Sequence, residues 1–238
     1  MHLKKAIILA GGEGTRIRTV EGKKPKSLIQ VTDKPILFYI LEHLKHYGFE
    51  EFIFSLGYGS EVIIEYLDQT FPKLKFNYVI EDTPLGTGGA LRYSFEQSEV
   101  ETYLVVNGDT FVNYNINNFV NFHSRFAQKF SLVAVSVDQS ERYGFLTFEG
   151  ELITNFLEKG NLQNGWINAG HYLINSSLFA SMMTDFGYET SEKFSLEEFM
   201  ERAAICLRLR GFKTHADFID IGVPDDLEFA RRQFIWPN

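Results

Sequence analysis

The chain has 238 residues, 45% of them hydrophobic and 23% charged, and this length suits one α/β domain or one domain with a small appendage. Its formal net charge of -8 argues against a nucleic-acid polymer as its partner. No apolar run approaches the roughly 20 residues that a membrane span needs, and no cleavable signal pattern opens the sequence. The single cysteine, Cys206, forms no intrachain disulfide, which favours a reducing, cytoplasmic location, and its apolar neighbours predict a core position.

A glycine-rich turn, residues 10–16, follows the first predicted strand at residues 6–9. Glycines at this place let the backbone turn tightly and bring its N–H groups close to a phosphate. Arg16 and Lys26 add two permanent cations, and residues 1–30 hold seven Lys and Arg against two Glu. The segment therefore predicts a site for a polyphosphate, although an ordinary solvated charge cluster is the alternative.

Strand-like and helix-like segments alternate along the first half of the chain. Asp33 is expected to cap a helix that has Pro35 near its first turn and runs to Gly48. Further strands are predicted at residues 51–56, 76–80 and 103–106, and helices at residues 60–67 and 88–97. This alternation predicts a mostly parallel sheet covered on both faces, which binds ligands at the carboxyl ends of its strands.

The pattern changes after about residue 130. Strands are expected at residues 131–137, 144–148, 152–157 and 167–174 with few helices between them, and helices at residues 195–203 and 225–233. No repeat or long linker interrupts the chain, which predicts a single domain with two lobes.

Two aspartates stand where predicted strands end. Asp109 follows the apolar strand at residues 103–106, and Asp220 follows Phe218-Ile219. If the fold brings them together, they suit Mg²⁺, which prefers a few carboxylates plus substrate phosphates. For either aspartate alone, capping of a turn is the competing interpretation.

Other segments carry weaker signals. Residues 82–90 form a second glycine-rich turn, suited to press against a flat ring or a sugar, and Glu81 precedes it. Lys159 can meet a substrate phosphate and Glu158 sugar hydroxyls, but a Glu-Lys pair is also common on surfaces. Ile17 stands where a dinucleotide fingerprint needs its third glycine. Because a P-loop and a serine-hydrolase elbow are also missing, a dehydrogenase, a P-loop kinase and a serine hydrolase are disfavoured.

The most specific pattern is a set of motifs spread in one order over the chain. They are residues 9–16 (LAGGEGTR) with Pro25-Lys26, residues 107–109 (NGD), Glu158-Lys159 and residues 218–222 (FIDIG). In this combination the chain resembles the sugar-phosphate nucleotidyltransferases, also called nucleotide-sugar pyrophosphorylases. Residues 84–90 (PLGTGGA), 107–110 (NGDT) and 218–224 (FIDIGVP) look most like the D-glycero-D-manno-heptose 1-phosphate guanylyltransferases within that family.

The resemblance implies an α/β fold of three layers, with a Rossmann-like mixed, mostly parallel sheet and a smaller sugar-binding lobe. The single domain would divide into a nucleotide-binding lobe at about residues 1–130 and a sugar-binding lobe with closing helices at about residues 131–238. It also implies a reaction in which a sugar 1-phosphate attacks the α-phosphorus of a nucleoside triphosphate and pyrophosphate leaves. The implied partners are GTP or another nucleoside triphosphate and a sugar 1-phosphate, with no nucleic acid or membrane; a homodimer stays open.

The same resemblance implies a role for each matching residue. Arg16, Lys26 and Asp109 would be catalytic, and Asp109 with Asp220 would hold Mg²⁺. Sugar phosphate would be bound by Gly144, Glu158, Lys159 and Asn168. The nucleotide would be bound by Leu9, Ala10, Gly11, Gly12, Gly14, Thr15, Glu81, Pro84, Gly86 and Thr87.

The base can be argued from chemistry at Glu81, which matches a position that carries glutamine in thymidylyltransferase relatives. A carboxylate only accepts hydrogen bonds, and guanine offers two adjacent donors, N1–H and N2–H. Uracil and thymine offer one ring N–H between two carbonyls. Guanine is therefore expected, with cytosine behind it.

Several alternatives remain open. GTP with mannose 1-phosphate and CTP with glucose 1-phosphate are the runner-up substrate pairs. A catalytically idle homologue that binds nucleotide sugars is an option from another class. A metal-dependent glycosyltransferase would be expected to carry an Asp-x-Asp motif, whereas residues 107–109 offer one carboxylate. Two departures from the family pattern are the missing proline in residues 17–20 and Phe218 in place of a tryptophan.

Overall fold

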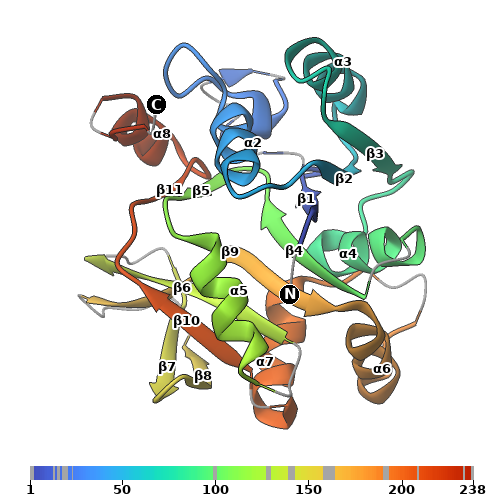
Figure 1. Ribbon diagram of the computed structural model, residues 1–238, viewed down its shortest axis with the longest axis vertical. Coiled ribbons are helices and arrows are strands. Elements are labelled where there is room, and N and C mark those ends of the chain that lie inside the picture. Colours follow the sequence, from blue (N-terminus) through green and yellow to red (C-terminus); the bar gives the residue numbers. More distant parts are fainter. Residues whose placement is uncertain are drawn as a thin grey trace.

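A nine-stranded mixed sheet forms the centre of the molecule (Figure 1). The computed structural model describes residues 3–12, 14, 17, 21–22, 24–98, 101–126, 130–138, 143–157, 164–189, 193–207, 209–232 and 234–236. In spatial order the strands are β3 (Lys75–Ile80), β2 (Glu51–Leu56), β1 (Lys5–Leu9), β4 (Thr102–Asn107), β9 (Asn164–Asn175), β6 (Phe130–Asp138), β10 (Arg210–Thr214), β8 (Leu152–Leu157) and β7 (Phe145–Glu149).

Strand direction differs between the two ends of this sheet. The pairs β1–β2, β2–β3 and β1–β4 are parallel, as the alternating pattern of the first half predicts. The long strand β9 pairs antiparallel with β4 and β6, and β7 and β8 form an antiparallel pair beyond β10. The sheet is therefore mixed, and it contains strands from both halves of the chain.

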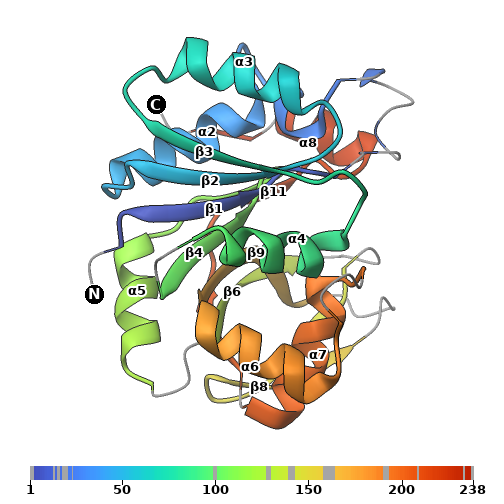
Figure 2. The ribbon, with the colours of Figure 1, turned by 90° about the vertical axis from the view of Figure 1, so that its right-hand side faces the viewer.

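Helices cover both faces of the sheet (Figure 2). One face packs against α2 (Ile36–His46), α3 (Ser60–Thr70), α5 (Ile116–Ser124) and α8 (Pro224–Arg232). The other face packs against α4 (Gly86–Glu96), α6 (Ser176–Phe186) and α7 (Leu196–Leu207). In β1, Ala6 and Ile8 join the first core and Ile7 the second, because successive side chains of a strand point to opposite faces. This three-layer α/β arrangement with a mixed sheet confirms the predicted fold class. The sheet is less parallel than expected, because β9 pairs antiparallel with β4, β6 and β7, and β8 pairs antiparallel with β7 and β10.

A small second sheet joins segments far apart in the sequence. β5 (Thr110–Val112) pairs antiparallel with β11 (Phe218–Asp220), and Asp220 lies opposite Thr110. The segment after α8 then returns to the first half of the chain, where Trp236 stacks on Tyr39 with ring centroids 4.3 Å apart. The segment that follows α8 therefore contacts α2, while α8 itself lies next to β11.

Two local predictions are wrong. Asp33 does not cap α2: the helix begins after Pro35, which has no side-chain cap, and Asp33 accepts a hydrogen bond from the Thr32 hydroxyl instead. Cys206 is exposed rather than buried. It lies in the last turn of α7, after the core residues Ala203 and Ala204. None of the helices in the described residues is long and apolar enough to cross a membrane.

Candidate active site

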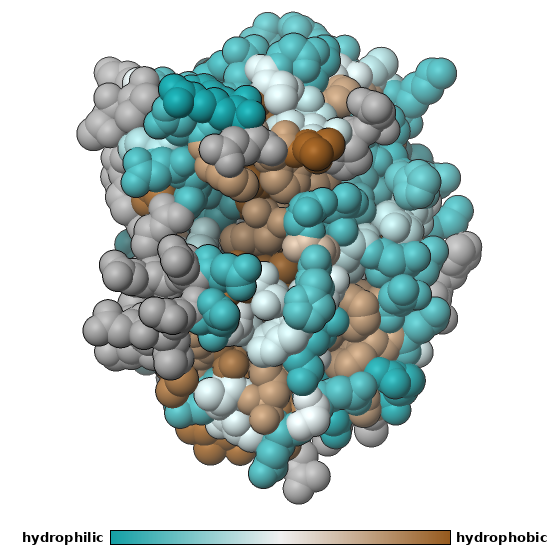
Figure 3. Space-filling model, turned by 90° about the vertical axis from the view of Figure 1, so that its left-hand side faces the viewer, coloured by the Kyte–Doolittle hydropathy of each residue, from teal (hydrophilic) through white to brown (hydrophobic). Residues whose placement is uncertain are grey.

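Two neighbouring cavities open where the parallel strands end. On the face of the molecule shown in Figure 3, hydrophobic residues gather around a central hollow. The smaller has a volume of about 260 Å³ and lies between the turn after β1, the end of β3 and the start of α4. The larger, about 780 Å³, is bounded by β7, β8, β9, α7 and β11. Lys26 and Asn107 line both cavities, so the two spaces adjoin.

The turns after β2 and β4 approach the turn after β1 too closely for a side chain at Gly57 or Gly108. A Cβ on Gly57 would lie 2.9 Å from the Gly11 carbonyl oxygen, and one on Gly108 would lie 2.9 Å from the Ala10 Cβ. The Gly108 N–H also donates to the Leu9 carbonyl oxygen at 2.9 Å. These approaches explain why glycines stand on both sides of the smaller cavity.

Most of the residues predicted to bind the nucleotide line the smaller cavity. They are Leu9, Ala10, Gly11, Gly12, Glu81, Pro84, Gly86 and Thr87. Gly14 does not line it; its φ of +61° belongs to a bend beside the Lys26 side chain. Thr15 and Arg16 lie outside the described residues.

Glu81 is held by two neighbours at the wall of this cavity. Its Oε2 accepts a hydrogen bond from the Leu85 N–H at 2.9 Å, and its Oε1 accepts one from the Ser55 hydroxyl at 3.3 Å. Burial raises the pKa of the Glu81 carboxyl, and the two hydrogen bonds oppose that rise. The carboxylate is thus fixed in orientation and retains a second lone pair on each oxygen for a ligand.

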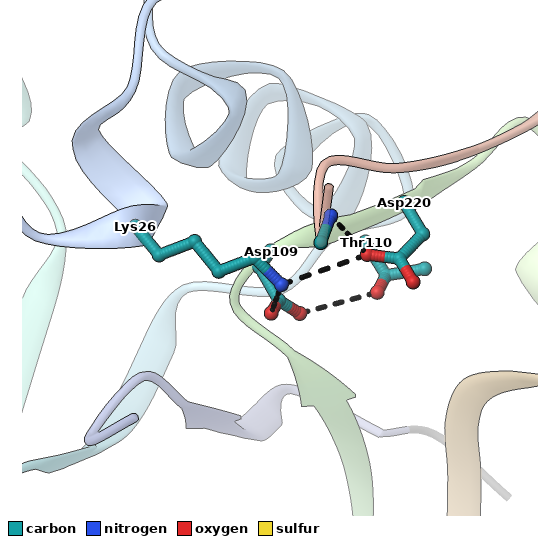
Figure 4. Close-up of polar contacts among 5 residues, drawn as sticks. Lys26, Asp109, Thr110 and Asp220 are labelled. Carbon is teal, nitrogen blue, oxygen red and sulfur yellow. Dashed lines mark hydrogen bonds and ion pairs between the residues drawn. The ribbon is translucent and has the colours of Figure 1, made fainter. Parts of the chain in front are cut away.

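Three charged side chains meet at the boundary of the two cavities (Figure 4). The Lys26 ammonium, on the short 3-10 helix η1 (Lys26–Leu28), donates to Asp109 Oδ2 and lies 3.6 Å from Asp220 Oδ1. Asp109 Oδ1 accepts from the Thr110 hydroxyl at 3.2 Å, and Asp220 Oδ1 accepts from the Gly222 N–H at 2.8 Å. The β5–β11 pairing brings the two aspartates together.

The two aspartates titrate in opposite directions. Burial opposes ionisation of Asp109, but the adjacent Lys26 outweighs it and holds the pKa of Asp109 below its ordinary value. Burial and the negative charge of Asp109 raise the pKa of Asp220, which gains less from Lys26 at the longer distance. Asp109 is therefore the more firmly ionised of the pair.

The donor set fits a magnesium ion. Two carboxylates already share one cation here, and Mg²⁺ takes one or two carboxylates together with substrate phosphates. Within the part of the chain that the structure describes, no cluster of three or more His, Cys, Asp or Glu forms a complete metal cage. A metal at Asp109 and Asp220 would thus depend on ligand oxygens for its remaining partners.

The predicted sugar-phosphate residues fall at the larger cavity where the structure describes them. Gly144 lines it, and a Cβ there would lie 2.8 Å from the Leu157 carbonyl oxygen. Asn168 donates from Nδ2 to the Tyr172 hydroxyl at 2.9 Å and accepts from the Gly170 N–H at 3.0 Å. Glu158 and Lys159 lie outside the described residues.

The segment that starts α7 also contributes side chains to both cavities, and no sequence motif predicts this. Lys193 lines the smaller cavity, and Glu197 and Glu201 line the larger one. The Ser-x-x-Glu signature at Ser195 and Glu198 predicts a helix start, but nothing local predicts which cavity the helix meets.

The chain is similar in sequence to a known protein family and to curated relatives. A family model described as nucleotidyl transferase matches residues 5–234. The chain is 35% identical over 230 residues to the D-glycero-alpha-D-manno-heptose 1-phosphate guanylyltransferase of Aneurinibacillus thermoaerophilus, covering 96% of this chain and 97% of the relative. It is 38% identical over 223 residues to the protein of the same name from Campylobacter jejuni, covering 93% and 96%.

A solved structure is also similar to this chain in its fold. HddC from Yersinia pseudotuberculosis, crystallised with GMP-PN, superposes with a TM-score of 0.80 at 31% identity, covering 98% of this chain and 100% of that one. The likeness therefore extends over essentially the whole length of both chains.

Proposed function

The chain belongs to the nucleotidyl transferase family, and on that premise we propose that it transfers a guanylyl group from GTP to D-glycero-α-D-manno-heptose 1-phosphate in the cytoplasm. A phosphate oxygen of the sugar phosphate attacks the α-phosphorus of GTP. The bond between the α-phosphorus and its bridging oxygen breaks, and pyrophosphate leaves. The products are the GDP-sugar and pyrophosphate.

The observation that carries this proposal is the cluster of Lys26, Asp109 and Asp220 at the boundary of the two cavities. Both reactants are anions, so catalysis depends on neutralising charge and aligning the attacking and leaving oxygens. Lys26 would neutralise phosphate oxygens there, and Arg16 would do so for the departing pyrophosphate. Asp109 and Asp220 would hold Mg²⁺, which supplies charge neutralisation at the phosphate when bound.

The remaining residues would hold each substrate in its own cavity. The glycine-rich turn at residues 10–14 and the turn at residues 84–87 would receive the nucleotide, and Glu81 would accept hydrogen bonds from guanine N1–H and N2–H. Gly144, Asn168, Glu158 and Lys159 would bind the sugar phosphate. This division assigns the nucleotide mainly to residues 1–130 and the sugar mainly to residues 131–238.

The test is pyrophosphate release with Mg²⁺, crossing GTP, CTP, dTTP, UTP and ATP against heptose, mannose and glucose 1-phosphates. We expect turnover with GTP and the heptose 1-phosphate, and loss of at least about a hundredfold in Asp109→Asn. Asp185→Asn, at an exposed carboxylate on α6, is the matched control and should keep the wild-type rate.

The other outcomes of this test contradict different parts of the proposal. Turnover with a different pair overturns the GTP or heptose assignment and leaves the reaction type intact. Folded protein that binds GTP but releases no pyrophosphate with any pair contradicts catalysis and supports the idle homologue.

A further inference from the structure

The carboxylate of Glu197 lies where the two substrate cavities meet α7, and none of the roles proposed above uses it. We propose that Glu197 accepts a hydrogen bond from a hydroxyl of the sugar 1-phosphate, and that Thr87, at the nucleotide turn, holds it in position. This inference rests on the proposed function and assigns a specificity-determining residue to it.

Thr87 fixes Glu197 through its hydroxyl group. The Thr87 Oγ1 donates to Glu197 Oε2 at 3.1 Å and accepts from the Leu196 N–H at 2.8 Å. Thr87 lies in the first turn of α4 and lines the nucleotide cavity. The Thr87 side chain, which is predicted to bind the nucleotide, thus points toward α7. Thr87 therefore lines the smaller cavity and also contacts a helix that borders the larger one.

The backbone around this hydrogen bond is firmly docked. The Phe194 N–H donates to the Leu85 carbonyl oxygen, and the Gly88 N–H donates to the Phe194 carbonyl oxygen, both at 3.1 Å. A Cβ on Gly86 would overlap the Phe194 carbonyl, and one on Gly88 would overlap the Phe194 ring. The start of α7 therefore keeps a fixed position against the glycine-rich start of α4.

Glu197 is not needed to cap its own helix. The Glu198 N–H donates to the Ser195 hydroxyl at 3.1 Å, and the Ser195 N–H donates to Glu198 Oε2 at 3.4 Å. This reciprocal pair satisfies the helix end without Glu197. Glu198 is consequently a matched control: it is an exposed glutamate on the same helical turn that does not line the sugar cavity.

The surroundings of Glu197 suit a sugar hydroxyl rather than a phosphate. Glu197 shares the larger cavity with Asn168, Tyr172 and Glu201. Carboxylates accept hydrogen bonds and repel anions, so the acidic side chains of α7 favour the polyol part of a sugar phosphate. Lys26 lines the same cavity, and α7 packs on the face of the sheet opposite to α2 (Figure 2). The charges thus orient the substrate, with phosphate toward Lys26 and hydroxyls toward α7.

Steady-state kinetics of four variants test the proposal. Glu197→Ala should raise KM for the sugar phosphate about tenfold or more, because a hydrogen bond to a charged acceptor is lost. We expect kcat and KM for GTP within about twofold of wild type, as the exposed site tolerates alanine. Glu198→Ala should lower Tm slightly and leave KM for the sugar phosphate unchanged. Thr87→Val should raise that KM, and Thr87→Ser, which keeps the hydroxyl, should restore it.

A series of monodeoxy sugar 1-phosphates identifies the contact directly. Wild-type protein should use the analogue that lacks the contacted hydroxyl less efficiently than the full substrate. Glu197→Ala should lose this discrimination and keep any discrimination against the other analogues. A merely structural tether between α4 and α7 would lower Tm in Glu197→Ala without changing selectivity among the analogues.

Failure of the inference and failure of the proposed function give different results. Turnover by wild type with an unchanged sugar-phosphate KM in Glu197→Ala overturns the inference alone, as does an equal rise in Glu198→Ala. If wild type uses a different nucleotide or sugar, the same comparison is made with that pair. If no pair turns over, calorimetric titration with the heptose 1-phosphate decides: weaker binding in Glu197→Ala supports the inference, and equal binding overturns it.

Discussion

Asp109 and Asp220 share one lysine unequally, and this difference has consequences for stability. Lys26 directly contacts Asp109 and lies 3.6 Å from Asp220, so the second carboxylate is left with part of its desolvation and repulsion uncompensated. A group whose pKa is raised on folding destabilises the folded state once it ionises. The site therefore maintains Asp220 at a cost in folding free energy.

Asp220→Asn should raise Tm near neutral pH in metal-free protein and abolish turnover. The gain should shrink as pH falls from the raised pKa of folded Asp220 toward the ordinary carboxyl pKa, because wild-type Asp220 then becomes neutral as well. The amide oxygen can still accept from the Gly222 N–H. Thermal melts between pH 4 and pH 8 measure this; a gain that does not change with pH would contradict the electrostatic explanation. Asp185→Asn serves as the control.

Glu81→Gln should reduce selectivity for GTP. We expect the ratio of kcat/KM for GTP to that for UTP to fall about tenfold or more, because an amide cannot accept both guanine donors through two oxygens. Asp82→Asn, at an adjacent exposed carboxylate outside the cavity, should keep the wild-type ratio. An unchanged ratio in Glu81→Gln would remove Glu81 from base recognition.

Residues that belong to local motifs could be placed from the sequence, and residues defined by distant contacts could not. Lys26, Asp109 and Asp220 follow glycine turns or strand ends, where charged groups reach a ligand at the edge of a sheet. The hydrogen bond between Thr87 and Glu197 joins two helices far apart in the chain. Neither side chain has a neighbour in sequence that indicates the other.

At the scale of elements, the start of α4 depends on a glycine that no other residue replaces well. Gly86 has a φ of +74°, and a Cβ there would also overlap the Phe194 carbonyl oxygen. Gly150, between β7 and β8, has a φ of +62° but no atom within 4 Å of a built Cβ. The two positions share a backbone strain and differ in steric overlap.

Gly86→Ala should therefore cost more than Gly150→Ala. We expect a loss in free energy of unfolding of about 2–4 kcal/mol for Gly86→Ala, from strain plus overlap, and about 1 kcal/mol for Gly150→Ala, from strain alone. Gly86→Ala should also raise KM for both substrates. Urea titrations and kinetics check this, and equal costs at the two sites would contradict the packing argument.

The elements of residues 1–107 agree with the prediction within a few residues, whereas several later elements are absent from it. These include the helices α5 and α6, although both carry buried residues at helical spacing. β1, β2 and β4 contain continuous apolar runs, and β3 carries Phe76, Tyr78 and Val79, so all four strands are predicted.

β10 is absent from the prediction because Arg210 and Lys213 interrupt its apolar pattern. In the structure, the Arg210 guanidinium lies 4.0 Å from the centroid of the Phe126 ring, and the Lys213 ammonium lies 4.7 Å from the centroid of the Phe148 ring. The three-residue strand β5 is too short for a sequence signal, whereas the apolar pair Phe218-Ile219 already indicates β11.

At the scale of the whole molecule, the segment after α8 fastens residues near 230 to the first half of the chain. Trp236 stacks on Tyr39, and its Nε1 donates to the Ala230 carbonyl oxygen at 3.3 Å. Arg231 Nε donates to the Gln30 carbonyl oxygen at 3.0 Å. The order of strands around β9 was likewise beyond prediction, because non-local pairing is decided by packing and leaves no pattern in the sequence.

Trp236→Ala should lower the free energy of unfolding by about 1–2 kcal/mol, since it removes a stacked and partly buried ring. Ile235→Ala is the matched control: Ile235 is 86% exposed and its truncation should change stability by less than about 0.5 kcal/mol. Chemical denaturation measures both. Equal effects would show that the ring does not fasten the segment.

The pairing of β5 with β11 also determines when, during synthesis, Asp220 can reach Asp109. β5 leaves the ribosome long before β11, so a nascent chain that ends ahead of Phe218 has Asp109 without Asp220. Such a chain already contains the glycine turns and Glu81. A chain that terminates there also lacks Leu227 and Ala230 of the first core, so premature termination would remove both the Asp220 carboxylate and part of the packing on that face of the sheet.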